Sequence, residues 1–319
     1  MKDALRIVYM GTPEFAVEPL KVLLEKGYNI VSVVTAPDRP AGRGRELKQS
    51  EIKRFALEHG LPVLQPEKLR DENFIETLKS LDADLFLVVA FRMLPETVWS
   101  MPPKGTVNLH ASLLPDYRGA APINHAIING ETVTGVTTFV ISHEIDTGEI
   151  LLQRKVGIGN DETAGELHDK LMIAGASLLL ETVEKIESST VKPFPQPEIP
   201  DIHPAPKLFR ETCEIDWNLP AERVKNLIRG LSPYPGAWCE LKNDVKTLQI
   251  KILKAYADPE KTENELPGTI VSDGKNFLKV ACSDGFLNVA ELQPQGKKIM
   301  PVKVFLSGFR DIKSYRSAK

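Results

Sequence analysis

Residues 105–146 read GTVNLHASLLPDYRGAAPINHAIINGETVTGVTTFVISHEID and contain the segment that decides the fold. Its first part, residues 106–111, is short, apolar and β-branched, which predicts a β-strand. Side chains alternate between the two faces of a strand, so Asn108 and His110 are expected to point the same way. An amide beside an imidazole at the end of a strand can polarise a carbonyl group and transfer a proton. The pair therefore indicates acyl-transfer chemistry.

Around this segment, the first half of the chain alternates between strand-like and helix-like patterns. Apolar strands are expected at residues 5–10, 30–35, 63–64 and 84–90, and helices at 13–24, 50–58, 74–81 and 163–186. This alternation predicts an α/β fold with a Rossmann-like, mostly parallel sheet and helices on both faces. Such sheets bind ligands at the carboxyl ends of their strands, where Asn108 and His110 would lie. The first turn, Gly11-Thr12-Pro13, is not a glycine-rich pyrophosphate turn, so we expect no nicotinamide cofactor.

A proline-rich segment separates this half from a different pattern. Six prolines lie between Pro193 and Pro206, which excludes a helix or a sheet interior and predicts an extended linker at residues 191–207. After the linker, one expected helix precedes short strands separated by Gly and Asp-Gly turns, as in a small antiparallel barrel. We therefore expect a catalytic domain at residues 1–190 and a smaller, OB-like antiparallel β-barrel domain at residues 208–319.

Composition limits the possible classes of function. The chain has 319 residues, 42% of them hydrophobic, which is normal for a globular protein of two domains. No run is long enough to span a membrane and no signal-peptide pattern is present, so we expect a cytoplasmic protein without membrane contact. The three cysteines match no metal-ligand or disulfide spacing, and we expect no metal. Residues 207–319 carry a net charge of +5 against −8 for the rest, which indicates either a polyanionic partner or a solvated basic face.

Asp146 completes a candidate catalytic set with Asn108 and His110. It lies 36 residues after the histidine, in a turn-rich break between two strand-like runs, and a loop there can carry it to the same sheet edge. Each residue also has a simpler explanation. An asparagine can satisfy backbone groups, a single histidine is more often structural, and Asp-Thr-Gly is an ordinary turn sequence. The three residues alone leave both interpretations open.

The segments around this set resemble those of the folate-dependent formyltransferases. Asn-x-His at residues 108–110, Ser-Leu-Leu-Pro at 112–115 and Asp-Thr-Gly at 146–148 occur in that family in the same order and at about the same spacing. Further similar segments extend the resemblance over nearly the whole chain: Gly11-Thr12-Pro13, residues 37–44, Ile215-Asp216-Trp217 and the basic C-terminal end. The resemblance implies that 10-formyltetrahydrofolate is the formyl donor. The longer set of motifs implies that the acceptor is the α-amine of methionine on initiator Met-tRNA.

By this resemblance, Asn108 and His110 stabilise the oxyanion that forms when the amine attacks the formyl carbon. Asp146 is expected to orient His110, to favour its protonated form and to help remove the amine proton, and the sequence leaves open which group takes that proton. The implied folate pocket is formed by the end of the strand at 84–90 and by the Ser-Leu-Leu-Pro loop: Val89, Ala90, Phe91, Ser112, Leu113, Leu114 and Pro115. Arg92 and Met93 stand where relatives often have Tyr-Gly, which indicates a local change in the pocket lining.

A basic segment at residues 36–54 is the candidate contact to the acceptor. It holds six basic residues against three acidic ones and connects the carboxyl end of a strand to a helix. A solvated, mobile loop is the simpler explanation, but the position near the active site favours insertion into the acceptor-stem groove, with Arg43 as the deepest contact. The expected tRNA-binding residues are Arg39, Arg43, Arg45, Lys48, Lys297 and Lys298. We expect the protein to act as a monomer.

Four other functions share part of this pattern. A sugar-nucleotide N-formyltransferase would have the three catalytic residues without the basic segment, and a formyltetrahydrofolate hydrolase would pass the formyl group to water. A ribonucleotide formyltransferase of purine synthesis would be a shorter, single domain. A catalytically inactive RNA-binding module would keep the basic regions without needing Asn108, His110 and Asp146 together. The acceptor used in an assay with 10-formyltetrahydrofolate distinguishes these functions.

Overall fold

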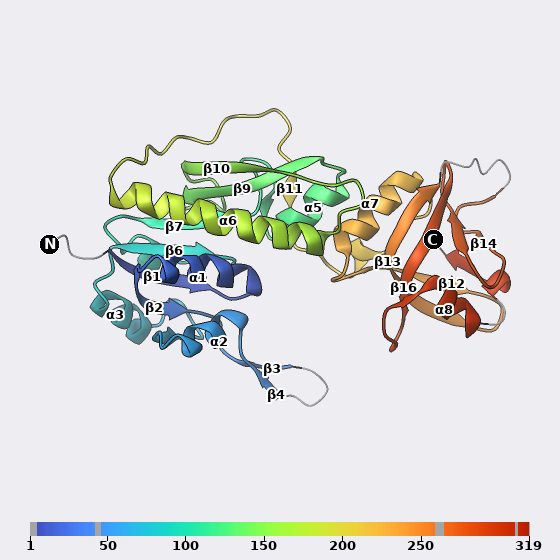
Figure 1. Cartoon of the computed structure of the whole chain (residues 1–319), viewed down its shortest axis with the longest axis horizontal. Helices are drawn as coiled ribbons and strands as arrows, with labels where there is room; N and C mark the ends of the chain where they lie inside the picture. The colour runs from blue at the N-terminus through green and yellow to red at the C-terminus, as the bar shows by residue number, and fades with distance from the viewer. Residues whose placement is uncertain (1–4, 42–45, 259–264, 310–311, 319) are drawn as a thin grey trace. The chain divides into compact units, whose positions relative to one another are not determined.

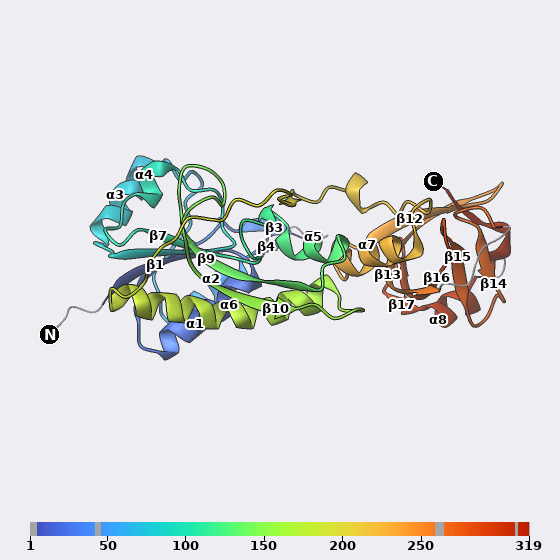
Figure 2. The same cartoon turned by 90° about the horizontal axis from the view of Figure 1, so that it is seen from above.

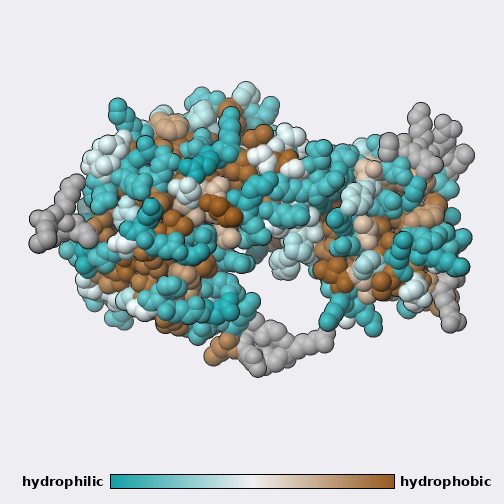
Figure 3. All heavy atoms as spheres, viewed as in Figure 1, coloured by the Kyte–Doolittle hydropathy of each residue, from teal (hydrophilic) through white to brown (hydrophobic). Residues whose placement is uncertain are grey.

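The structure is a computed structural model that describes residues 5–41, 46–258, 265–309 and 312–318. The chain divides into two compact units (Figure 1). The first unit comprises Met1–Gly119, Thr134–Val156 and His168–Pro204, and the second comprises Ala120–Val133, Gly157–Leu167 and Ala205–Lys319. On the face shown in Figure 3, most of the surface is hydrophilic, with hydrophobic residues between. Within the described ranges, no helix is long and apolar enough to cross a membrane.

A seven-stranded sheet forms the centre of the first unit, in the order β10-β9-β7-β6-β1-β2-β5. Its strands are β1 (Arg6–Gly11), β2 (Asn29–Val34), β5 (Val63–Leu64), β6 (Leu85–Val89), β7 (Thr106–His110), β9 (Val133–Val140) and β10 (Ile150–Gly157). The neighbours from β7 to β5 are all parallel, and β9 runs antiparallel to β7. The expected Rossmann-like, mostly parallel sheet is therefore confirmed.

Helices cover both faces of this sheet (Figure 2). The helices of the first half are α1 (Val17–Glu25, after the short 3-10 helix η1, Glu14–Ala16), α2 (Glu51–Glu58), α3 (Glu72–Ser80), α4 (Glu96–Trp99) and α6 (Ala164–Glu187). On one face, Val8 and Met10 of β1 join a hydrophobic cluster with side chains of α3 and α4. On the other face, α6 lies against β7, where the missing side chain of Gly175 makes room for Leu109. The continuous apolar strands are thus buried on both sides.

Polar side chains explain where several helices begin. Ser50 and Asp71 accept hydrogen bonds from backbone N–H groups in the first turns of α2 and α3. Before α6, the Glu166 carboxylate accepts from Thr163 N at 2.8 Å, and Thr163 Oγ1 accepts from Glu166 N at 3.3 Å. This reciprocal capping satisfies N–H groups that the helix itself leaves unpaired.

The expected loop at residues 36–54 is a β-hairpin followed by α2 (Figure 1). Strand β3 (Arg39–Ala41) pairs antiparallel with β4 (Glu46–Lys48). Residues 42–45, which connect the two strands, lie outside the described residues. The sequence did not reveal this hairpin because each strand has only three residues and neither shows an apolar alternation.

An antiparallel sheet forms the second unit, in the order β14-β15-β16-β13-β12-β18, with β17 paired to β16. A bridge between Thr269 and Arg316 joins the two ends of this order, so the sheet is the nearly closed barrel that we expected. Trp217 is buried in its core, and its Nε1 donates to Ser317 Oγ at 2.7 Å. The strands are β12 (Ala237–Lys242), β13 (Thr247–Asp258), β14 (Ile270–Ser272), β15 (Leu278–Ala281), β16 (Phe286–Pro294), β17 (Met300–Pro301) and β18 (Arg316–Ala318).

Three helices accompany the barrel: α5 (Pro122–Ile128), α7 (Ala221–Leu231) and α8 (Val302–Ser307). Two further 3-10 turns are η2 (Glu211–Cys213) and η3 (Ile312–Ser314). Helices α5 and α7 pack closely because Gly230 of α7 brings its backbone against Ile128. The helix α5 therefore belongs to the second unit, although it precedes the linker in the chain.

All three cysteines are buried in the second unit without a disulfide bond. Burial raises the pKa of the Cys239 and Cys282 thiols to about 12 and also raises the pKa of Cys213. These thiols therefore stay protonated at neutral pH and behave as small apolar side chains.

The proline-rich linker lies extended along the first unit before it reaches the barrel (Figure 2). Phe194 exchanges two backbone hydrogen bonds with Ile150 of β10, at 2.8 and 3.0 Å. Further along, the carbonyl of His203 accepts from Tyr117 N at 2.7 Å. Two short strands lie near these points, β8 (Arg118–Gly119) and β11 (Pro204–Ala205). The linker is thus held to the sheet domain at specific residues.

Candidate active site

Three neighbouring parallel strands end at one edge of the first unit's sheet. Strands β1, β6 and β7 end at Gly11, Val89 and His110, and Gly11 lies directly opposite Val89 in the register. A side chain at Gly11 would collide with Ala16, so glycine lets the chain turn closely above the strand end. Ligands of such sheets bind at this carboxyl edge.

Asn108 and His110 lie on the same face of β7, as predicted. Thr106 shares this face and donates from Oγ1 to Trp99 O in α4 at 2.6 Å, whereas Leu109 faces α6 on the other side. Asn108 is half-buried, and among the described residues its side-chain amide has no hydrogen-bond partner. The amide is therefore available to a bound ligand.

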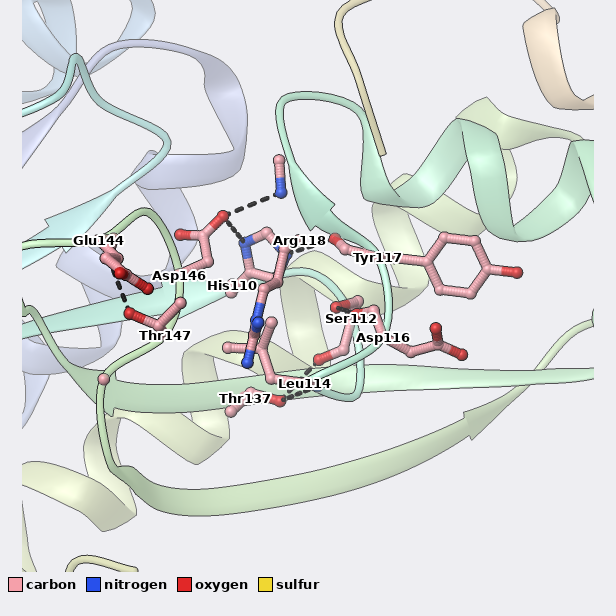
Figure 4. A network of polar contacts seen from close by, with 12 residues as sticks. His110, Ser112, Leu114, Asp116, Tyr117, Arg118, Thr137, Glu144, Asp146 and Thr147 are labelled. Atoms are coloured by element: carbon pink, nitrogen blue, oxygen red, sulfur yellow. Dashed lines mark hydrogen bonds and ion pairs between the residues drawn. The ribbon is translucent and has the colours of Figure 1, made fainter. Parts of the chain in front are cut away.

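His110 is 7% exposed, and both nitrogens of its ring face specific groups (Figure 4). Nε2 lies 2.9 Å from the carbonyl oxygen of Tyr117, and Nδ1 lies 3.9 Å from Asp146 Oδ2. A carbonyl can only accept, so Nε2 carries the hydrogen and Nδ1 is the nitrogen that faces Asp146. The distance of 3.9 Å between Nδ1 and Oδ2 is too long for a hydrogen bond, so the two side chains are neighbours without a direct bond.

Asp146 reaches this position through a tightly folded turn. Its backbone has a φ of 55°, and Gly148 in the same turn lies so close to the carbonyl of Val140 that no side chain would fit. The Asp146 carboxylate is held by the backbone of the preceding loop, because Gly119 N donates to Oδ2 at 2.9 Å. The structure thus brings the three predicted catalytic residues to one place.

The Ser-Leu-Leu-Pro loop is held from inside the protein. Ser112 Oγ donates to the carbonyl of Asp116 at 2.6 Å, and Thr137 Oγ1 donates to the carbonyl of Ser112 at 2.7 Å. Gln153 Nε2 donates to the carbonyl of Leu114 at 2.9 Å. Leu114 itself is buried against β9 and β10, and Pro115 is also buried. Leu113 lies over Gly135, where a side chain would collide with it.

The other predicted folate residues follow β6. Val89 is buried, Ala90 is exposed with a φ of 49°, and Phe91 is half-buried. The guanidinium of Arg92 lies 5.3 Å from the Phe91 ring centroid and donates to two backbone carbonyls, those of Pro66 and Glu67. Burial, and secondly the charge of Arg39, lower the pKa of Arg92 below its usual value. The Arg92 side chain therefore links two loops at the sheet edge, and Met93 is exposed.

The β3–β4 hairpin carries two of the predicted tRNA-binding cations. Arg39 and Lys48 are both exposed and lie directly opposite each other in the register. Like charges in directly opposite positions destabilise a strand pair, and Glu51 compensates part of this charge because its carboxylate lies 3.9 Å from Lys48 Nζ. Arg43 and Arg45, the other two predicted contacts in the segment, lie outside the described residues.

The base of this hairpin is fixed by Asp38. Its carboxylate accepts from Lys53 Nζ at 2.6 Å and from Gln65 Nε2 at 2.8 Å. The hydrogen bond from Lys53, followed by that from Gln65, lowers the pKa of Asp38 below its usual value. The hairpin therefore leaves the sheet domain in a defined direction at neutral pH.

The remaining predicted contacts, Lys297 and Lys298, belong to the second unit. Both are exposed, in the turn between β16 and β17 that contains Gly296 with a φ of 75°. Both ammonium groups are thus accessible to an anion.

Sequence reasoning missed four groups that hold the site together. They are the carbonyl of Tyr117, the N–H of Gly119, and the side chains of Thr137 and Gln153. The first two are backbone groups, which every residue has, so no residue type could indicate them. Thr137 faces His110 across the β7–β9 pair, and a threonine in an apolar strand was the one available signal.

Comparisons with known proteins agree on one family. Residues 5–183 match the formyl transferase family, and residues 207–310 match the formyl transferase C-terminal domain. The methionyl-tRNA formyltransferase of Bacteroides fragilis is 54% identical over 319 residues, covering 99% of this chain and 98% of that protein. The methionyl-tRNA formyltransferase of Flavobacterium johnsoniae is 50% identical over 306 residues, covering 96% of each.

Two solved structures share the fold at low sequence identity. A sugar 3N-formyl transferase in the presence of dTDP and 5-N-formyl-THF has a TM-score of 0.65 at 20% identity, covering 92% of this chain and 99% of that chain. HypX from Aquifex aeolicus in complex with tetrahydrofolic acid has a TM-score of 0.64 at 19% identity, covering 96% of this chain and 48% of that chain. Together with the sequence matches, these likenesses lead to one conclusion: the chain belongs to the formyl transferase family.

Proposed function

We propose that this protein transfers the formyl group of 10-formyltetrahydrofolate to the α-amine of methionine on initiator Met-tRNA. The observation that carries the proposal is the meeting of three groups at the carboxyl edge of the sheet. These are the amide of Asn108, which has no partner in the described part of the chain, the Nδ1 atom of His110 and the carboxylate of Asp146. Methionyl-tRNA formyltransferases of near half identity over the whole chain support the choice of acceptor.

Each of the three residues has a defined task in this reaction. The neutral amine attacks the formyl carbon, a C–N bond forms, and negative charge develops on the formyl oxygen. Asn108 donates to that oxygen from its amide, and the protonated Nδ1 of His110 donates to it as well, because Nε2 is already used by Tyr117. Asp146 stabilises the charged imidazole and stands within reach of the proton that the amine loses. The bond to the folate nitrogen then breaks, and that nitrogen takes up a proton.

The donor is placed along the same sheet edge. Ala90 and Phe91 follow β6 directly beside β7, and the backbone at Ala90 is exposed there. The folate ring lies against Ala90 and Phe91, next to the fully buried Val89. Residues 112–115 form the rigid wall that keeps His110 and the ring in place. Burial of Ser112 and Leu114 supports a wall of fixed shape rather than one that adapts to the ligand.

The acceptor tRNA is held at two basic places. Arg39, Arg43, Arg45 and Lys48 of the hairpin segment contact the acceptor end, and Lys297 and Lys298 of the barrel contact phosphates. The exposure of Arg39 and Lys48 on opposite strands of the hairpin supports this role, since both cations are accessible to phosphates. In this proposal residues 1–190 form the catalytic domain, 191–207 the linker and 208–319 the tRNA-binding domain of a cytoplasmic monomer.

One assay tests the function. The protein is incubated with 10-formyltetrahydrofolate and Met-tRNA, a UDP-aminosugar or buffer alone, and the formylated product is measured. We expect formylation of Met-tRNA far above the other two reactions. Preferential formylation of the aminosugar, release of formate alone, or no reaction with any acceptor would each contradict the proposal and point to one of the other functions.

A further inference from the structure

Gln196 differs in exposure from its neighbours in the linker. Along residues 192–198 every residue is exposed except Gln196, which is half-buried. The two hydrogen bonds between Phe194 and Ile150 fix the chain two residues earlier. The position of Gln196 relative to the sheet domain is therefore fixed.

The side chain of Gln196 contacts two segments: the turn that carries Asp146 and the segment that carries Gly119, whose N–H binds the Asp146 carboxylate. Its Nε2 donates to the carbonyls of Asp146 at 2.8 Å and Gly148 at 2.9 Å. Its Oε1 accepts from Arg118 Nη2 at 2.6 Å and from Nε at 3.2 Å. The next residue after Arg118 is Gly119, whose N–H holds the Asp146 carboxylate. The amide thus closes a ring of contacts around the catalytic carboxylate.

We propose that Gln196 is a positioning residue for Asp146, so that the linker sets the geometry of the catalytic site. This inference rests on the proposed function. Gln196 touches neither His110 nor the reacting atoms, and it acts by holding the turn that presents Asp146.

The conformation of this turn explains why such a hold is needed. Asp146 has a φ of 55°, in the left-handed region that residues with a side chain adopt uncommonly, although aspartate does so more readily than most. Gln196 supplies two N–H donors to carbonyls of this turn, and Arg118 fixes the amide in the orientation that this requires. Without these donors, the turn is free to relax and to carry Oδ2 away from its 3.9 Å separation from His110 Nδ1.

Gln196→Glu is the sharpest variant, because glutamate has the same shape. It keeps an oxygen for Arg118 and replaces both N–H donors with an acceptor that faces two carbonyls. Glu198→Ala, two residues further along the same exposed linker, is the matched control. Turnover and KM are measured for Met-tRNA formylation, and the rate of formate release is measured in buffer alone.

We expect Gln196→Glu to lower both rates about tenfold, because both reactions use the misplaced Asp146, with KM for Met-tRNA nearly unchanged. Glu198→Ala should keep both rates. Gln196→Glu combined with Asp146→Asn should be no slower than Asp146→Asn alone, since the two residues act through one group.

Three results would overturn the inference: a loss confined to KM for Met-tRNA, unchanged turnover, or losses that multiply in the double variant. Equal melting temperatures of Gln196→Glu and the wild-type protein would exclude a general loss of folding.

The proposed function can fail separately. If the wild-type protein released formate but did not formylate Met-tRNA, the proposed function would be contradicted, and the rate of formate release would still test the role of Gln196.

Discussion

At the scale of single residues, His110 divides its two ring nitrogens between a structural and a chemical role. The hydrogen bond from Nε2 to the Tyr117 carbonyl fixes the ring plane, and Nδ1 remains for the substrate and for the charge of Asp146. The side chain of Tyr117 points away from the imidazole, so only its backbone takes part (Figure 4).

His110→Ala and Asp146→Asn should each lower turnover by at least about a hundredfold, because both groups act on the transition state. Neither change should affect folding strongly, since the Gly119 N–H still finds an acceptor in asparagine. Steady-state kinetics with Met-tRNA and circular dichroism on the same preparations measure the two effects. Near-normal turnover in either variant would remove that residue from the catalytic set.

Asn108→Ala should lose about 2–4 kcal/mol of transition-state stabilisation, as expected for a donor to an oxyanion. Its amide has no partner among the described residues, so thermal stability should stay the same or rise slightly. The comparison of kcat/KM with the melting temperature separates the two effects. A marked fall in melting temperature at unchanged kcat/KM would show that Asn108 is structural.

The placement of the three proposed catalytic side chains at one sheet edge could be predicted because their types and their positions in the chain carry chemical information. Their supports could not be predicted, and the reason is physical. Whether the Tyr117 carbonyl or the Gly119 N–H faces the site depends on backbone torsion angles, such as the φ of 59° at Tyr117, that tertiary contacts impose. Gln196 lies 50 residues after Asp146 in the chain, and only the path of the linker brings them together.

At the scale of elements, the β3–β4 hairpin has a fixed start at Asp38 and carries charged side chains on both of its strands. The Asp38–Lys53–Gln65 contacts anchor it, and Arg39 and Lys48 face each other across it. A rigid base lets an element present cations without losing much conformational freedom on binding. The hairpin is thus suited to guide a long polyanion towards the sheet edge.

Arg43→Ala should weaken formylation of Met-tRNA much more than release of formate to water. Water needs only the catalytic site, whereas a tRNA-linked amine must be brought within bonding distance of the formyl carbon. Arg43→Lys should recover part of the loss, because arginine makes forked contacts that lysine cannot. Both reactions are measured on one preparation at two salt concentrations. Equal losses in the two reactions would assign Arg43 to the folate site or to the fold.

Several long elements could be predicted from their periodicity, whereas the short strands of the hairpin could not. Strands such as β6 are continuous apolar runs, and α3 begins at the N-cap residue Asp71. The three-residue strands of the hairpin lack any such period, and their pairing depends on the fixed base below them. The assignment of helix α5 to the second unit could not be predicted, because it depends on Gly230, more than 100 residues later.

At the scale of the whole molecule, the two compact units are not consecutive pieces of the chain. The second unit takes residues 120–133 and 157–167 from the first half in addition to the barrel. Helix α7 contacts one of these segments, since Arg229 Nη1 donates to the carbonyls of Gly159 and Glu162 at 3.2 and 3.1 Å. Cutting the chain in the linker would expose these surfaces, so point substitutions are the better test of tRNA binding.

Changing Lys297 and Lys298 together to glutamate should weaken Met-tRNA binding and leave folate binding unchanged. If both lysines contact phosphates, the slope of log affinity against log salt should fall by roughly 1.5. Lys275→Glu, an exposed lysine elsewhere in the barrel, controls for net charge. An unchanged affinity at low salt would remove this turn from the tRNA-binding surface.

The distribution of the three cysteines offers a way to watch one unit alone. Cys213, Cys239 and Cys282 are all buried in the second unit, and the sequence has no other cysteine. Their protonated, inaccessible thiols should react with a thiol reagent only when the barrel opens. The rate of labelling, followed by mass spectrometry, therefore measures how often the barrel opens. Labelling that slows when tRNA is added, but not when folate is added, would assign the two ligands to different units without any substitution.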